Sequence, residues 1–140
     1  MSDLERFVDA QRDVYAQALS EIRAGRKRSH WMWFIFPQIT GLGSSATSKH
    51  FAIRDRAEAE AYLRHPILGP RLLELAQAVL DLAGKSASEI FGYPDDLKLQ
   101  SSATLFSAVS EPGSVFDRLL QQYFDGQHDR RTLDLLRTPD

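Results

Sequence analysis

The chain has 140 residues, 43% of them hydrophobic and 26% charged, as is ordinary for one folded domain. A net charge of −2 provides no field to attract nucleic acid or an anionic membrane, and no apolar run approaches the ~20 residues that span a bilayer. The absence of cysteine excludes disulfides, thiol nucleophiles and thiolate metal sites. Residues 1–5 lack the basic-then-apolar order of a signal peptide, so we expect a cytoplasmic single domain over residues 1–140.

Helical spacing of apolar residues runs through almost the whole chain. The first predicted helix covers residues 4–22 and ends near Gly25. Most of the later segments begin with Asp, Ser or Pro and are followed by Gly or Pro, the residues typical of helix starts and stops. These segments are 55–65, 70–83, 86–92, 94–109, 114–125 and a last helix with Leu133, Leu135 and Leu136. The sequence therefore predicts an all-α, compact domain of about five to seven helices.

Two segments, 30–36 and 39–50, have no clear period. Residues 31–36 form a continuous apolar run that periodicity cannot assign to a strand or a helix. Residues 40–45 form a small polar loop with two glycines. A single strand would have no partner to pair with, so the all-α prediction stands.

The segment 29–38, Ser-His-Trp-Met-Trp-Phe-Ile-Phe-Pro-Gln, contains both tryptophans and follows the basic run 26–28. Aromatic rings stack on planar ligands, basic side chains contact phosphate, and a glutamine can read a polar edge, so this block is suited to a nucleotide-like ligand. The glycines at 41 and 43 do not complete a phosphate-loop or dinucleotide motif. The candidate ligand-binding residues are Arg28, Trp31, Trp33, Gln38, Lys49 and, from a later segment, Ser102.

The same block has a purely structural interpretation. Aromatic side chains usually serve the core, and the basic run 26–28 would complement the C-terminal end of the first helix. A third alternative makes the aromatic block an exposed patch that anchors a protein partner.

A second group of polar residues lies at the start of the helix predicted over 94–109. A carboxylate, an ammonium and a hydroxyl one turn apart are the types that serve as base, electrophile and nucleophile. Local capping by an aspartate, an ion pair with the lysine and close packing at the serines explain the same residues without chemistry. The candidate catalytic residues are His30, Asp95, Asp96, Lys98 and Ser101. The four histidines have no paired ligand spacing, so we expect no metal or cofactor.

Three stretches together resemble the domain-of-unknown-function family 1810. They are 29–43, then 61–72 with Tyr-Leu-x-His-Pro-x-Leu-Gly, and 90–106 with Ile-Phe-Gly-x-Pro-Asp-Asp-x-Lys-x-x-Ser-Ser. Ala103 departs from the pattern, where methionine is expected. The resemblance implies a small all-α bacterial domain without an established activity, and it suggests a link to nucleotide or ADP-ribose metabolism. The calpastatin label that members sometimes carry does not fit, because calpain-inhibitor segments are disordered and this composition is that of a packed domain.

We therefore expect a small cytosolic domain that binds, and processes if it is an enzyme, an anionic nucleotide-like metabolite. The alternative is a non-catalytic interaction module that uses the aromatic block 29–38. Nucleic-acid binding is not expected, because the basic run is short and the overall charge is negative. The leading hypothesis requires segments 26–49 and 94–104 to meet in the folded protein.

Overall fold

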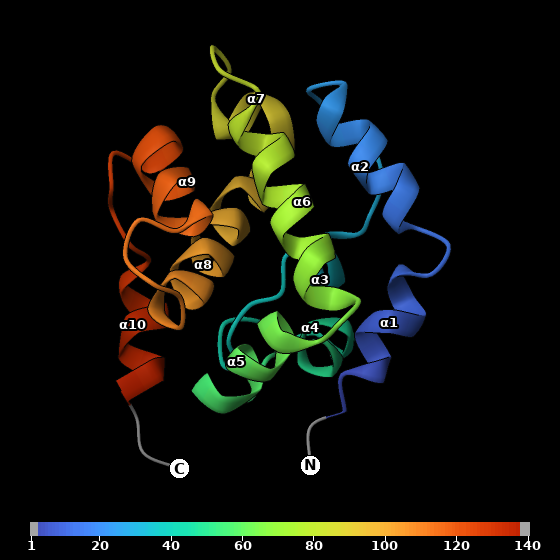
Figure 1. Cartoon of the computed structure of the whole chain (residues 1–140), viewed down its shortest axis with the longest axis vertical. Coiled ribbons are helices and arrows are strands. Elements are labelled where there is room, and N and C mark those ends of the chain that lie inside the picture. The colour runs from blue at the N-terminus through green and yellow to red at the C-terminus, as the bar shows by residue number, and fades with distance from the viewer. Residues whose placement is uncertain (1–2, 138–140) are drawn as a thin grey trace.

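A computed structural model of the protein describes residues 3–137, and these residues form ten helices (Figure 1). The all-α prediction is confirmed, but the prediction of five to seven helices is wrong. The helices are α1 (Glu5–Gln11), α2 (Tyr15–Arg23), α3 (Met32–Ile35), α4 (Ala46–His50), α5 (Arg56–Arg64), α6 (Leu68–Leu80), α7 (Ala87–Phe91), α8 (Asp95–Ala108), α9 (Val115–Phe124) and α10 (Arg130–Arg137).

The three additional helices have local causes. The predicted first helix breaks between Gln11 and Tyr15, which lets α1 pack against α3 while α2 packs against α6. The short helices α3 and α4 lie in the two segments without a clear period. Each is little more than one turn long, too short for a period of 3.6 residues to show in the sequence.

The long helices α6, α8 and α9 form the centre of the fold (Figure 1). Helix α6 packs against α2, α5 and α9, and α8 contacts α5, α7, α9 and α10. Residues 101–106 of α8 are buried on every side, and the serine and threonine side chains among them allow neighbouring helices to approach closely. The largest fully buried side chains are Phe7, Trp31, Phe36, Tyr62 and Phe106.

Side-chain caps fix the starts of several predicted helices. Asp55 accepts a hydrogen bond from the backbone N–H of Glu58 at 2.9 Å and begins α5. Ser86 and Glu89 form a reciprocal capping box at the start of α7, with distances of 2.8 and 3.0 Å. Such caps pair amide groups that would otherwise lack partners in the first turn.

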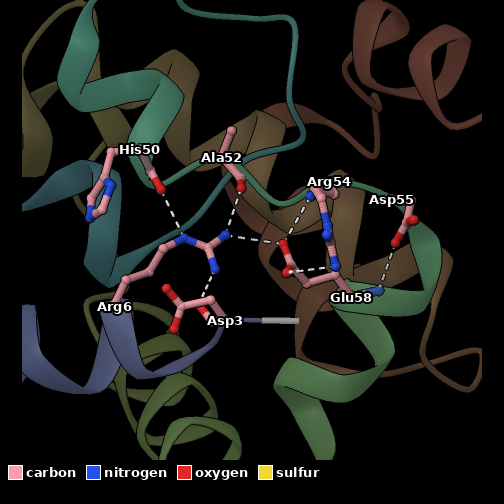
Figure 2. A network of polar contacts seen from close by, with 7 residues as sticks. All are labelled: Asp3, Arg6, His50, Ala52, Arg54, Asp55 and Glu58. Atoms are coloured by element: carbon pink, nitrogen blue, oxygen red, sulfur yellow. Dashed lines mark hydrogen bonds and ion pairs between the residues drawn. The ribbon is translucent and has the colours of Figure 1, made fainter. Parts of the chain in front are cut away.

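Figure 2 shows a buried ion pair that ties α1 to α4 and α5. Arg6 Nη2 lies 3.1 Å from Glu58 Oε1, and the two side chains are 11% and 1% exposed. The same guanidinium donates to the backbone carbonyls of Asp3, His50 and Ala52, while Glu58 also accepts from the backbone N–H of Arg54. A buried charge pair with every partner in place holds three chain segments together, and removing one partner is costly.

The loop between α3 and α4 is anchored by one parallel β-bridge between Ile39 and Ile53. The backbone N–H of Ile53 donates to the carbonyl of Gln38, and that of Thr40 donates to the carbonyl of Ile53, both at 2.8 Å. Within residues 3–137 no helix is long and apolar enough to cross a membrane.

Candidate functional site

A buried carboxylate positions the segment that leads into the aromatic block. Glu21, in the last turn of α2, is 8% exposed. Its Oε1 accepts from the backbone N–H groups of Arg28 and Ser29 and from Trp31 Nε1, at 2.7 to 3.0 Å. Its Oε2 accepts from the Ser29 hydroxyl and from Gln17 Nε2. Burial alone would raise the Glu21 pKa, but these hydrogen bonds lower it to about 2.

Two lysines from distant parts of the chain meet at one carboxylate. Lys27 Nζ lies 2.7 Å from Asp95 Oδ2, and Lys98 Nζ lies 3.1 Å from Asp95 Oδ1. The side chains of Lys27, Asp95 and Lys98 are 7%, 20% and 23% exposed. Segments 26–49 and 94–104 therefore do meet, as the leading hypothesis requires.

Aromatic rings lie beside both ammonium groups. Lys98 Nζ is 4.3 Å from the centroid of the Trp33 ring, and Lys27 Nζ is 5.0 Å from that of the Trp31 ring. These distances are within the range of cation–π attraction. The backbone N–H of Lys27 donates to the carbonyl of Ile90 at 2.7 Å, which fixes this lysine to the end of α7.

These groups line a half-open cavity of about 150 Å³, which we call the lysine pocket. It is lined by Lys27, His30, Trp31, Met32, Trp33, Phe34, Thr47, Asp95 and Lys98. The two lysines and one aspartate carry a net charge of +1. Burial would raise the Asp95 pKa, but hydrogen bonds from Lys27 and Lys98 hold it below its usual value. The Asp95 carboxylate is therefore ionised at neutral pH, and one positive charge in the pocket remains unbalanced.

A second, much smaller cavity lies next to the lysine pocket, and we call it the Gln38 hollow. Its volume is about 10 Å³, and Trp33 lines both cavities. The hollow also contacts Gln38, Gly43 and Lys49. Gly43 is needed there, because a Cβ at this position would lie 2.5 Å from Ser48 Oγ and 3.0 Å from the Trp33 ring.

The predicted site residues divide into three groups. The lysine pocket brings together five of them: His30, Trp31, Trp33, Asp95 and Lys98. The Gln38 hollow holds Gln38 and Lys49 beside Trp33. The remaining predicted residues line neither cavity; they are Arg28, Asp96, Ser101 and Ser102.

Three of the residues that line neither cavity have other contacts or lie in the core. Ser101 Oγ lies 3.1 Å from the Leu97 carbonyl and 3.1 Å from Asp129 Oδ2, so it faces the start of α10. Asp96 Oδ1 accepts from the backbone N–H of Leu97 at 2.9 Å, and Ser102 is 1% exposed. The hydrogen bonds of Ser101 are made with Leu97 and Asp129 and do not include His30, the base that the sequence suggested for it.

Sequence reasoning missed Lys27 and Glu21. It assigned the basic contact to Arg28, whose side chain is exposed, while the neighbouring Lys27 faces Asp95. The chain between α2 and α3 has no regular period, so the sequence does not show which basic residue points inward. Glu21 lies beside the apolar residues Leu19 and Ile22 of its helix. A carboxylate next to apolar residues was the signal in the sequence that could have indicated its burial.

Comparisons with known proteins place the chain in a family. A family model described as a protein of unknown function, DUF1810, matches residues 1–136. The chain belongs to the DUF1810 family. The chain is similar to the crystal structure of the conserved hypothetical protein Rv1873 from Mycobacterium tuberculosis, with a TM-score of 0.95 and 52% sequence identity, and the match covers 98% of each chain. A search of curated proteins gave no match.

Proposed function

We propose that this DUF1810 protein binds a small anionic, nucleotide-like metabolite in the lysine pocket. The observation that carries the proposal is the sharing of Asp95 by Lys27 and Lys98, at 2.7 and 3.1 Å, on the wall of an open cavity. Lys27 Nζ also donates to the Ser29 carbonyl, but Asp95 is the one carboxylate among the residues that line the pocket, so one positive charge there lacks an anionic partner. An anionic ligand group, such as a phosphate oxygen, would supply that partner through charge-assisted hydrogen bonds.

The shape of the lysine pocket narrows the ligand class. At about 150 Å³ the cavity is smaller than the roughly 300–1,000 Å³ of pockets that enclose drug-sized ligands. It therefore suits one part of a nucleotide-like molecule, such as a phosphate with its sugar, and the remainder would lie outside. The Trp33 ring, partly exposed beside Lys98, provides an apolar face for stacking.

The pocket also contains the groups that a proton-transfer step needs. His30 is exposed and lines the cavity together with Asp95. Histidine is the side chain best suited to exchange protons near neutral pH. The ionised Asp95 would hold the two lysines in place and has no proton to donate, because its pKa is lowered. We assign His30 as the first residue to substitute if a bound metabolite is converted to a product.

The interaction-module alternative lacks the exposed aromatic surface that it needs. Trp31 and Phe36 are each 1% exposed, and Met32 and Ile35 are also buried. A protein partner would therefore meet mainly Trp33 and Phe34, which are half-buried. We rank metabolite binding first for this reason.

A thermal-shift screen against phosphate, nucleotides, ADP-ribose, nicotinamide dinucleotides and sugar phosphates tests the proposal. A ligand at ~100 times its dissociation constant stabilises the protein by roughly 2.7 kcal/mol and raises the melting temperature by several degrees. The shift should be lost in Lys98→Met and retained in Lys85→Met, because Lys85 is exposed and lies outside the pocket. No shift with any compound, or an equal shift in Lys98→Met, would contradict the proposal.

A further inference from the structure

The side chain of Gln38 has an unused donor in the protein interior. Gln38 is 4% exposed, and its Nε2 is the one buried side-chain nitrogen or oxygen within residues 3–137 that has no hydrogen-bond partner. Leaving a buried donor unpaired destabilises the folded state, so native proteins rarely do so without a reason. The backbone carbonyl of Gln38 accepts a hydrogen bond from the N–H of Ile53, so the backbone of this residue is anchored.

The Gln38 hollow has room for one acceptor atom. Its volume of about 10 Å³ is close to that of one water-sized sphere, which fits a single oxygen. Lys49 lines the hollow and is exposed, so it places a cation where the hollow meets solvent. A hydroxyl or carbonyl oxygen would accept the hydrogen bond that Gln38 Nε2 can donate.

The hollow and the lysine pocket are neighbouring cavities that share Trp33 and residues of α4. Trp33 lines both cavities. Helix α4 supplies Thr47 to the lysine pocket and the next two residues, Ser48 and Lys49, to the hollow. A molecule that occupied both cavities would lie beside Trp33, with the lysine ammonium groups in one cavity and the Gln38 amide donor in the other.

We propose that the two cavities form one composite site, in which Gln38 donates a hydrogen bond to a hydroxyl or carbonyl oxygen of a phosphorylated sugar or nucleoside. This inference rests on the proposed function, since it requires the phosphate to be held by Lys27 and Lys98. It makes Gln38 the residue that distinguishes a phosphorylated sugar from a bare inorganic anion. The hollow takes one oxygen of the ligand, and the phosphate does not enter it.

The test compares two matched pairs of probes: ribose 5-phosphate with inorganic phosphate, and ADP-ribose with pyrophosphate. Affinities are measured by isothermal titration for the wild-type protein, Gln38→Met and Lys98→Met. Gln38→Met keeps the side-chain length but removes the donor, so it should weaken the sugar-containing probes about tenfold and leave the inorganic probes unchanged. Lys98→Met should weaken all four. Gln122→Met, at an exposed glutamine, is the matched control and should leave every affinity unchanged.

Side-chain signals in proton–nitrogen NMR spectra locate the effect directly. The Gln38 amide signal, assigned by its loss in Gln38→Met, should shift with ribose 5-phosphate but not with inorganic phosphate. The Trp33 indole signal should shift with both. If Gln38→Met binds every probe like the wild type and the Gln38 signal stays fixed, the hollow holds only an internal water and the composite site is wrong. If Lys98→Met changes no affinity, or no probe binds the wild type, the proposed function itself fails and the composite site falls with it.

Discussion

Replacing Glu21 by glutamine tests whether one buried carboxylate holds residues 28–31 in place. The substitution keeps the size of the side chain but exchanges one acceptor oxygen for an NH2 group. Glu21 Oε1 accepts from Arg28, Ser29 and Trp31, and Oε2 accepts from the Ser29 hydroxyl and Gln17 Nε2. Whichever way the carboxamide is turned, its NH2 group would therefore face hydrogen-bond donors and could not accept from them.

The lowered pKa of Glu21 sets the size of the effect. A change from its ordinary value of 4.5 to about 2 corresponds to about 3 kcal/mol in favour of the charged form in the folded state. Because the folded pKa lies below the unfolded one, this stability is fully present above about pH 5 and is lost as the pH falls toward 2. We expect Glu21→Gln to be about 3 kcal/mol less stable than the wild type at neutral pH, and only about 1 kcal/mol less stable near pH 3.

Urea unfolding followed by tryptophan fluorescence at several pH values measures this difference. Glu111→Gln, at an exposed glutamate, is the matched control and should change stability by less than about 0.5 kcal/mol at every pH. Equal stability of Glu21→Gln and the wild type at neutral pH would contradict the stabilising role of the Glu21 carboxylate. A stability gap that stays constant from neutral pH to about pH 3 would also refute it, because it would show that the charge of Glu21 is not what stabilises the segment.

Three further substitutions test other parts of the structure. Glu58→Gln leaves the buried Arg6 without its ion-pair partner, so urea unfolding should show a loss of roughly 3 kcal/mol; a loss below about 1 kcal/mol would contradict the burial of the pair. Gly69→Ala would place a Cβ 2.2 Å from the Leu63 carbonyl oxygen, so the melting temperature should fall by several degrees, and an unchanged value would contradict the close contact of α5 and α6. Asp95→Asn should be less stable than the wild type at neutral pH. Because the Asp95 pKa is lowered, the difference should shrink as the pH falls below 3.8, and a difference independent of pH would contradict the ion pairs with the lysines.

The helices that sequence reasoning predicted are those whose ends carry their own chemical signals. Asp55 and Ser86 cap α5 and α7 through hydrogen bonds to residues three positions later, and such local contacts are visible in the sequence. The break between α1 and α2 has no such signal. Gln11, at this break, is buried, and its side-chain amide donates hydrogen bonds to the Phe34 carbonyl and the Tyr62 hydroxyl, which are distant in sequence. Tertiary contacts of this kind decide where a helix ends and cannot be deduced from spacing.

The residue types of the candidate site could be predicted from the sequence, but not which of these residues contact one another. The aromatic block and the Asp95–Lys98 pair stood out, because Lys98 lies one turn after Asp95 on α8. The contact of Lys27 with Asp95 joins residues 68 positions apart through an irregular segment, so its geometry follows from the packing of Trp31 and from Glu21. Arg28 and Lys27 are equivalent in the sequence, and only the fold distinguishes them.

The most direct test of the lysine pocket is a crystal structure of the protein grown with ADP-ribose or ribose 5-phosphate at millimolar concentration. We expect a phosphate oxygen within hydrogen-bond distance of Lys98 Nζ and Lys27 Nζ, with part of the ligand against the Trp33 ring. A ligand bound elsewhere on the protein, with Asp95 still the only anionic group beside Lys27 and Lys98, would contradict the proposed site.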